Sequence, residues 1–325
     1  MVEITPLDIF IQQIITGLSN GAIIALIALG YTMVYGIVEL VNFAHGDVFM
    51  LGGFFALTLL GIFFPELDVL ALSQQNRIVS ISLLLLGVPL FCGALNWSID
   101  YVAYRPIRNA PRLAPLVSAI GISFILVNIG LFWGDLPISY FQNGSAAAPK
   151  DFPALFSADN LLGEDAALLI TWRELFVWVV TIPIMALLTF IVQKTTMGKA
   201  MRAVAQNPMA AKLMGINVDN VIGQTFIIGG VLAGIASVVY SLYNNTIFFQ
   251  MGYRAGMDAF AAAVIGGIGN LPGAFLGGLF IGIVRAFSDG YIATSWTNVI
   301  VFSLLIAVLV FKPSGLLGAH FREKV

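Results

Sequence analysis

Apolar and polar residues follow one another along this chain in long blocks, and most apolar blocks are long enough to cross a membrane. A membrane-spanning helix needs about 20 apolar residues, whereas a membrane barrel strand would show alternation over about 10 residues. The pattern therefore predicts an all-α, polytopic helix bundle. Seven blocks are predicted as full spans, at residues 9–35, 48–64, 78–99, 113–133, 175–192, 221–243 and 291–311.

A further apolar block, residues 257–287, is interrupted near its middle by the glycine-rich stretch 266–273. Glycines permit sharp turns, and Pro272 cannot continue a helix. We expect a broken or re-entrant helix pair here, with the break at membrane depth, which gives eight to nine membrane segments. Such a break lines a wet cavity or is buried in protein, and close helix packing through glycine is an equally compatible alternative. The candidate residues for a translocation path are Gly266, Gly267, Gly269 and Asn270.

Basic residues are unevenly distributed among the loops, and this bias predicts the orientation of the spans. They cluster after the third, fifth and last predicted spans, which places those loops and the C-terminus in the cytoplasm. In the loop at residues 134–173, five acidic residues precede Thr171, and Lys150 is the only basic residue before it. The loop is therefore expected to be extracytoplasmic. The N-terminus is expected on that outer side too. The number of spans then requires block 257–287 to return to the side from which it entered.

Composition supports the same class of protein. Of the 325 residues, 59% are hydrophobic and 10% are charged, whereas a soluble domain carries about 25% charged residues. We therefore expect one integral membrane domain over residues 1–325, in contact with membrane lipid. The formal net charge is −2 and no large basic cluster is present, which argues against nucleic acid as a partner. Cys92 is the sole cysteine, so the chain cannot form an internal disulfide.

The polar segment at residues 193–220, between two apolar blocks, contains the clearest local signals in the chain. Asn207 is a favoured helix N-cap, and Pro208 suits the first helical position. Gly215 is placed to end the helix in a left-handed conformation. A helix of about two turns is unstable alone in water, so this one, with Ala211 near its centre, is expected to pack against a soluble partner.

A second polar cluster, at residues 39–47, joins the first two predicted spans. Ionisable groups near membrane depth are costly and usually face a cavity or a partner. Asn42, His45 and Asp47 are therefore candidates for the inner end of a permeation path. The alternative, which we favour for Asp47, is that it caps the helix starting at Val48 with His45 as a local hydrogen-bond partner.

The sequence argues against an enzyme, and no catalytic, cofactor-binding or metal-binding residue is predicted. Only two histidines occur, and no HExxH or GxxxxGK[ST] motif is present. Any ATP that drives transport must therefore be bound by another chain. Few acids lie within the spans to carry protons. Two pairs of opposite charge four residues apart are expected to pair locally, Arg254 with Asp258 and Arg285 with Asp289.

Several motifs in order resemble the LivH-type permeases of branched-chain and neutral amino-acid ABC importers. The resemblance runs from about residue 9 to residue 317, and residues 142–162 depart from it most. It is carried by the motifs at residues 30–36 (GYTMVYG), 42–47 (NFAHGD), 104–108 (YRPIR), 118–121 (SAIG), 202–205 (RAVA), 210–211 (AA), 215–217 (GIN) and 263–270 (AVIGGIGN).

The resemblance implies a permease subunit in the bacterial inner membrane, translocating branched-chain or other neutral amino acids. It implies a second, LivM-like permease subunit, two cytoplasmic ATPase subunits and a periplasmic amino-acid-binding protein as partners. Residues 207–217 are similar to a coupling helix that contacts an ATPase, with Asn207, Pro208, Ala211 and Gly215 as its key residues. The alternatives are the same architecture carrying urea or short amides, and an ion-coupled secondary carrier acting alone.

Overall fold

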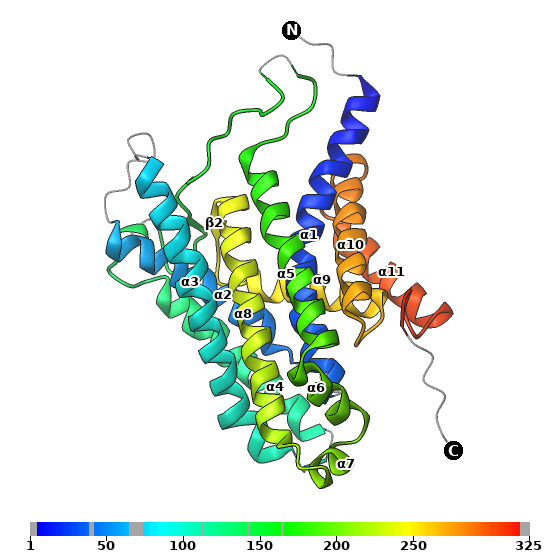
Figure 1. Cartoon of the computed structure of the whole chain (residues 1–325). Helices are drawn as coiled ribbons and strands as arrows, with labels where there is room; N and C mark the ends of the chain where they lie inside the picture. Colours follow the sequence, from blue (N-terminus) through cyan, green and yellow to red (C-terminus); the bar gives the residue numbers. More distant parts are fainter. Residues whose placement is uncertain are drawn as a thin grey trace.

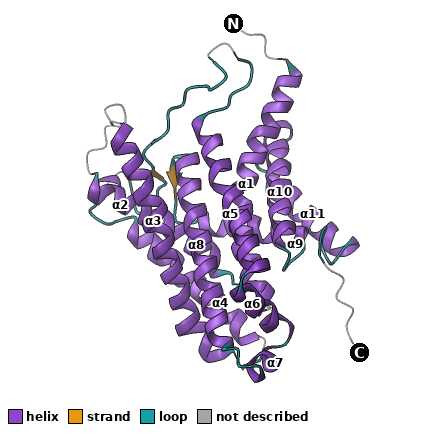
Figure 2. Cartoon of the chain, viewed as in Figure 1, coloured by secondary structure: helices purple, strands orange, loops and turns teal. Residues whose placement is uncertain are grey.

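The computed structural model describes residues 5–38, 42–64, 74–108, 110–111, 113–141, 144–163 and 166–318. Most of this part is helical, and its sheet consists of two short strands (Figure 2). The expected polytopic helix bundle is thereby confirmed. Seven described helices are long and apolar enough to cross a membrane: α1 (Pro6–Val38), α2 (Ala44–Phe63), α3 (Gln74–Ile99), α4 (Leu113–Trp133), α5 (Trp172–Lys194), α8 (Val218–Asn244) and α10 (Leu271–Tyr291).

The remaining elements are shorter and join or flank these helices. Four are α-helices: α6 (Thr196–Gln206), α7 (Pro208–Leu213), α9 (Met251–Gly266) and α11 (Thr297–Phe311). A π-helical turn, η1 (Asp100–Tyr104), and a 3₁₀ turn, η2 (Arg105–Ile107), extend α3, and η3 (Ser139–Phe141) lies in the loop after α4. Strand β1 (Lys150–Asp151) pairs antiparallel with β2 (Thr246–Ile247).

Helices α1, α2 and α8 form the centre of the bundle. In their most apolar stretches 83%, 72% and 72% of the residues are buried, against 17% in α4 and in α5, which therefore lie at the periphery. Helix α1 packs along α10 through glycines. A Cβ atom added at Gly282 would lie 2.2 Å from the Cα atom of Gly21, and one added at Gly21 would lie 2.7 Å from that of Leu279. Small residues of this kind allow helix backbones to approach closely within a membrane.

The glycine-rich interruption separates α9 from α10, as predicted. Gly267 and Gly269 adopt left-handed φ angles of 106° and 86°. Asn270 caps α10 by accepting a hydrogen bond from the backbone N–H of Gly273 at 3.1 Å. The break lies beside Gly36, where an added Cβ would be 3.3 Å from the Cα of Gly269. It is therefore next to the last turn of α1 and not beside its middle, where a break at membrane depth was expected.

The C-terminal helices differ from the prediction. The span expected at residues 291–311 is represented by a shorter helix, because α10 runs through Tyr291 and α11 has only 15 residues, fewer than the 20 or so that a perpendicular span needs. Arg285, which is buried, and Asp289, which is exposed, each bind a side chain of a neighbouring helix. The guanidinium of Arg285 binds Asp258, and the Thr297 hydroxyl binds Asp289. These contacts let α10 continue past them.

The two ends of the bundle carry different elements (Figure 1). The N-terminus and α7 lie at opposite ends. The loop between α4 and α5 lies at the end that carries the N-terminus, because Gln12 of α1 exchanges two hydrogen bonds with the backbone of Leu169, at 3.1 and 2.9 Å. The same loop contributes β1, which pairs with the segment that follows α8.

Candidate functional site

Helix α7 begins and ends as the sequence predicts. The side chain of Asn207 accepts a hydrogen bond from the backbone N–H of Ala210 at 3.0 Å, and Pro208 follows at the first helical position. Gly215 has a φ angle of 84°. Its N–H donates to the carbonyl of Lys212, and the N–H of Ile216 donates to that of Ala211. This paired ending satisfies the last carbonyls of the helix, so α7 has a fixed length.

One face of α7 is apolar and uncovered. Met209 is 70% exposed, and Leu213 and Met214 are each 82% exposed, while Ala211 is buried. Beside α7 lies a groove of about 1020 Å³, bounded by the end of α1, η2 and the start of α8. Exposed apolar side chains at one end of a bundle are typical of a surface that a partner covers.

Helix α6, which precedes α7, was not predicted. Its N-cap is Thr195, whose hydroxyl accepts a hydrogen bond from the backbone N–H of Gly198 at 3.1 Å. A threonine at this position is a recognisable start signal, but Gly198 within the first turn weakens it. The polar segment at residues 193–220 therefore contains two consecutive capped helices.

An ion cluster connects the start of α8 to the end of α3. Arg108 binds both carboxylate oxygens of Asp100, at 2.5 and 2.7 Å, and it also binds Asp219 in the first turn of α8. Arg105 lies 3.6 Å from Asp219. The Arg108 and Asp100 side chains are only 14% and 4% exposed. Asp219 lies more than 100 positions from Arg105 and Arg108, so no spacing in the sequence indicates its contacts with them.

Asn42 and His45 are buried in helix contacts. The side chain of Asn42 accepts a hydrogen bond from the hydroxyl of Tyr104 at 2.8 Å and donates to Asn96 at 3.5 Å. The ring of His45 packs edge-on against Tyr31, with 4.8 Å between ring centroids. An added Cβ at Gly30 would meet the His45 ring at 2.4 Å. In the structure both side chains join elements together, and neither lines the cavity described next.

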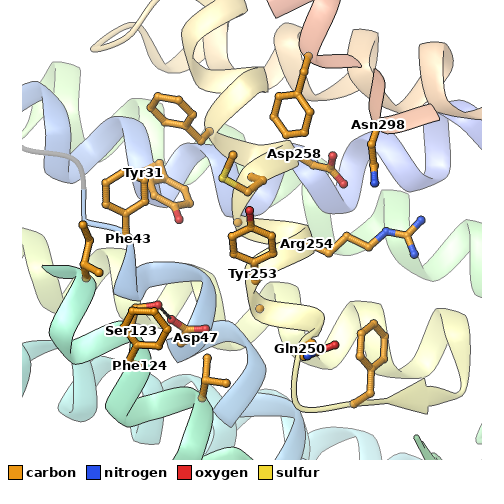
Figure 3. A pocket seen from close by; sticks show the side chains of 18 residues that line it. Tyr31, Phe43, Asp47, Ser123, Phe124, Gln250, Tyr253, Arg254, Asp258 and Asn298 are labelled. Carbon is orange, nitrogen blue, oxygen red and sulfur yellow. Dashed lines mark hydrogen bonds between the residues drawn. The ribbon is translucent and has the colours of Figure 1, made fainter. Parts of the chain in front are cut away.

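A cavity of about 790 Å³ opens between α1, α2, α4, α9 and α11 (Figure 3). Most of its wall is apolar or aromatic, and a few polar side chains interrupt that wall. The apolar side chains include Phe43, Ile120, Phe124, Val127, Phe248, Met257, Phe260 and Phe302, and the polar ones are Asp47, Ser123, Gln250, Arg254, Asp258 and Asn298. Such a wall suits a ligand that is largely apolar and carries a few polar groups.

Asp47 is not the helix cap that we favoured. Helix α2 begins at Ala44, and its N-cap, Phe43, makes no side-chain hydrogen bond. Asp47 lies four residues after this N-cap, within the first turn. One of its oxygens, Oδ2, accepts a hydrogen bond from the hydroxyl of Ser123 on α4 at 2.5 Å (Figure 3). The expected local pairing of Asp47 with His45 is likewise absent from the hydrogen bonds of the described residues.

The break between α9 and α10 does not contribute to this cavity. Gly266 and Gly273 pack backbone to backbone, since an added Cβ at Gly266 would meet the Gly273 carbonyl oxygen at 2.1 Å. A turn after α11 covers the end of α9. The N–H groups of Leu316 and Leu317 donate to the carbonyls of Ile265 and Gly266, and the Asn270 amide donates to Leu317. This geometry corresponds to the close-packing alternative.

The expected local ion pairs on α9 and α10 are wrong. Arg285 of α10 binds Asp258 of α9 at 2.6 Å, across the two helices. Asp289 accepts instead from the hydroxyl of Thr297. In the described ranges, no three His, Cys, Asp or Glu side chains come together in a way that would hold a metal ion.

A bundle of long apolar helices, with an internal cavity and a capped, exposed helix at one end, is the architecture of a multi-pass membrane protein. Residues 13–309 match the family described as "Branched-chain amino acid transport system / permease component", and the chain belongs to this family. The chain is therefore a transport permease and one component of a transport system.

Similarity to individual members extends over nearly the whole chain. The chain is 39% identical over 318 residues to the high-affinity branched-chain amino acid transport system permease protein LivH of Salmonella typhimurium, covering 97% of this chain and 98% of that protein. It is 38% identical to the corresponding protein BraD of Pseudomonas aeruginosa, over 97% and 98% of the two chains. A probable LivH of Methanocaldococcus jannaschii is 28% identical over 99% and 98%. No solved structure matches the chain.

Proposed function

We propose that this chain is the permease subunit of an ATP-driven importer that carries branched-chain or other neutral amino acids across the bacterial inner membrane. The whole chain acts as one permease domain. Its partners are a second, LivM-like permease subunit, two cytoplasmic ATPase subunits and a periplasmic amino-acid-binding protein. The similarity to LivH and BraD, which are named as permeases for branched-chain amino acids, supports this substrate class.

The proposed orientation places α7 in the cytoplasm and the N-terminus outside. Residues 193–220 carry Lys194, Lys199, Arg202 and Lys212, as expected of a cytoplasmic loop. The loop at residues 134–173 is extracytoplasmic. The C-terminus is cytoplasmic in this arrangement, as its basic residues predict.

Helix α7 is the observation that carries the proposal. It is capped at both ends, it exposes Met209, Leu213 and Met214, and it is joined within five residues to the central helix α8. An ATPase subunit that binds this face moves α7 as a rigid body. The motion then reaches α8 directly and reaches the end of α3 through Arg108. This coupling switches the bundle between outward and inward access.

The cavity supports an apolar amino acid in preference to urea or a short amide. Its wall includes five phenylalanines, two tyrosines, Ile120, Val127 and Met257, and such a surface favours a ligand with an apolar side chain. An ion-coupled carrier would need carboxylates free to exchange protons or sodium. Of the three buried aspartates among the described residues, Asp100 and Asp258 are already paired with arginines, and Asp47 alone has no counter-charge.

Uptake by vesicles tests the proposal. Vesicles that contain the chain with its permease, ATPase and binding-protein partners are expected to accumulate leucine, isoleucine or valine only when ATP is supplied on the α7 side. Vesicles without the ATPase subunits are expected to accumulate none. Uptake by this chain alone, driven by a proton or sodium gradient, would show that it is a secondary carrier.

A further inference from the structure

Three aspartates are buried in the described part of the chain, and one of them differs from the other two. Asp100 and Asp258 each bind an arginine, at 2.5 and 2.6 Å. Asp47 is 2% exposed, and no lysine, arginine or histidine pairs with it among the described residues. A buried charge without a partner is costly, so the lack of a counter-charge at Asp47 requires an explanation.

The carboxylate of Asp47 is only half satisfied. Its Oδ2 atom accepts from the Ser123 hydroxyl at 2.5 Å, while its Oδ1 atom is buried and has no hydrogen-bond partner among the described residues. The first turn of α2 offers partial positive charge, which favours a carboxylate there. The N–H groups of this turn donate no hydrogen bond to Oδ1, so this strong acceptor has no donor among the described residues.

Asp47 lies inside the bundle and on the wall of the cavity. Helix α2 begins beside the interior of α1, because His45 packs against Gly30, eight residues before α1 ends at Val38. Figure 3 shows Asp47 and Ser123 together at one side of the cavity, next to the ring of Phe124. A ligand in the cavity can therefore meet a carboxylate and apolar side chains at once.

We propose that Asp47, positioned by Ser123, binds the ammonium group of the transported amino acid. The side chain of that amino acid then occupies the apolar part of the cavity. The inference rests on the proposed function and names the substrate contact within it. An ammonium is a strong donor and supplies the missing counter-charge. Arg254 lines the same cavity and has no ion-pair partner in the described part of the chain. The cavity thus offers both signs of charge to a zwitterion.

The first test is the amount of leucine taken up per ATP hydrolysed by the complete importer in vesicles. Asp47→Asn is expected to lower this ratio about tenfold or more, the factor for one lost charge-assisted contact. ATP hydrolysis stimulated by the binding protein remains, since α7 is untouched. Ser123→Ala is expected to lower the ratio less, and Asp47→Glu to retain part of it. An unchanged ratio in Asp47→Asn would overturn the proposal.

The loop between α4 and α5 provides a matched control. Ser157 donates a hydrogen bond to Asp159 there, on an exposed surface. Asp159→Asn and Ser157→Ala remove the same chemical groups outside the bundle, and both are expected to leave uptake per ATP unchanged. A loss equal to that of Asp47→Asn in these variants would also overturn the proposal.

The second test measures ligand binding in the purified complex. Phe124→Cys places a thiol on the cavity wall, where the native residue is 67% exposed. Cys92 is fully buried, so it is not expected to react with the reagent. Leucine and leucinamide, which carry the amine, are expected to slow its alkylation by a water-soluble reagent. 4-Methylpentanoate, which lacks the amine, is not. Asp47→Asn is expected to abolish the difference.

The two failures are distinguishable. Equal protection by 4-methylpentanoate and leucine, or no alkylation of Phe124→Cys in any state, would refute the ammonium site even in an importer that transports leucine. Conversely, a wild-type complex without ATP-dependent uptake would refute the proposed function. The protection series would still report whether the cavity selects an amine.

Discussion

Gly215 fixes the end of α7 through its backbone conformation. Its φ angle of 84° is costly for a residue with a side chain, by about 1–2 kcal/mol, although no neighbouring atom would meet an added Cβ. Gly215→Val is therefore expected to shift the end of α7 without blocking insertion. We expect uptake to fall severalfold while ATP hydrolysis by the assembled complex continues, as measured in vesicles.

Two variants separate strain from loss of coupling. Gly163 also has a left-handed φ, of 100°, and open space around it, at the other end of the bundle. Gly163→Val should introduce similar strain and leave uptake intact. Gly215→Asn, which tolerates the left-handed region better, should retain most uptake. Normal uptake by Gly215→Val would reject the proposed importance of the helix end.

The buried pair between Arg108 and Asp100 makes a prediction about stability. Arg108→Gln leaves the Asp100 carboxylate, 4% exposed, without its partner. Breaking a buried pair in this way costs about 3–5 kcal/mol, which a lowered thermal unfolding midpoint in detergent would reveal. Adding Asp100→Asn should restore part of the loss. Arg105→Gln, whose pair with Asp219 is about half exposed, should cost about 1 kcal/mol or less.

At the scale of elements, the packing of α1 on α10 depends on the absence of side chains at their contact. A Cβ at Gly282 would meet backbone atoms of Gly17 and Gly21 at 2.2–2.3 Å. Gly282→Val is expected to separate the two helices and cost about 1–3 kcal/mol, measured as a lower unfolding midpoint and a lower folded yield. Gly121→Val on α4, where nothing lies within 4 Å, should change neither.

Local chemistry decided which elements the sequence could predict. The start and end of α7 depend on Asn207, Pro208 and Gly215, which act within one or two turns, and both were predicted correctly. The division of α9 from α10 depends on nearby glycines and was also predicted. The boundary between α10 and α11 was missed because the contacts beside it, of Thr297 with Asp289 and of Arg285 with Asp258, form only in the folded bundle.

The cavity could not be predicted, for a reason that belongs to the whole molecule. Its wall comes from α1, α2, α4, α9 and α11, and no periodicity in any one of them indicates the others. The sequence identified the cluster at residues 42–47 as unusual, but it gave the wrong role for Asp47. The hydrogen bond between Asp47 and Ser123, on which the proposed binding role depends, joins residues 76 positions apart. Membrane character, in contrast, follows from composition and block length alone.

The orientation of the whole molecule makes the last prediction. Exposed residues at the two ends of the bundle are expected to lie on opposite sides of the membrane, with the basic α6–α7 segment inside. Leu162, 52% exposed, lies in the loop between α4 and α5, and Lys199 is exposed on α6. In right-side-out vesicles, an impermeant thiol reagent should label Leu162→Cys at once. It should label Lys199→Cys only after the membrane is permeabilised.

The unmodified chain is the control, because its single cysteine, Cys92, is fully buried. The reverse pattern would place α7 outside the cell, where no cytoplasmic ATPase could bind it. That result would contradict the proposed coupling.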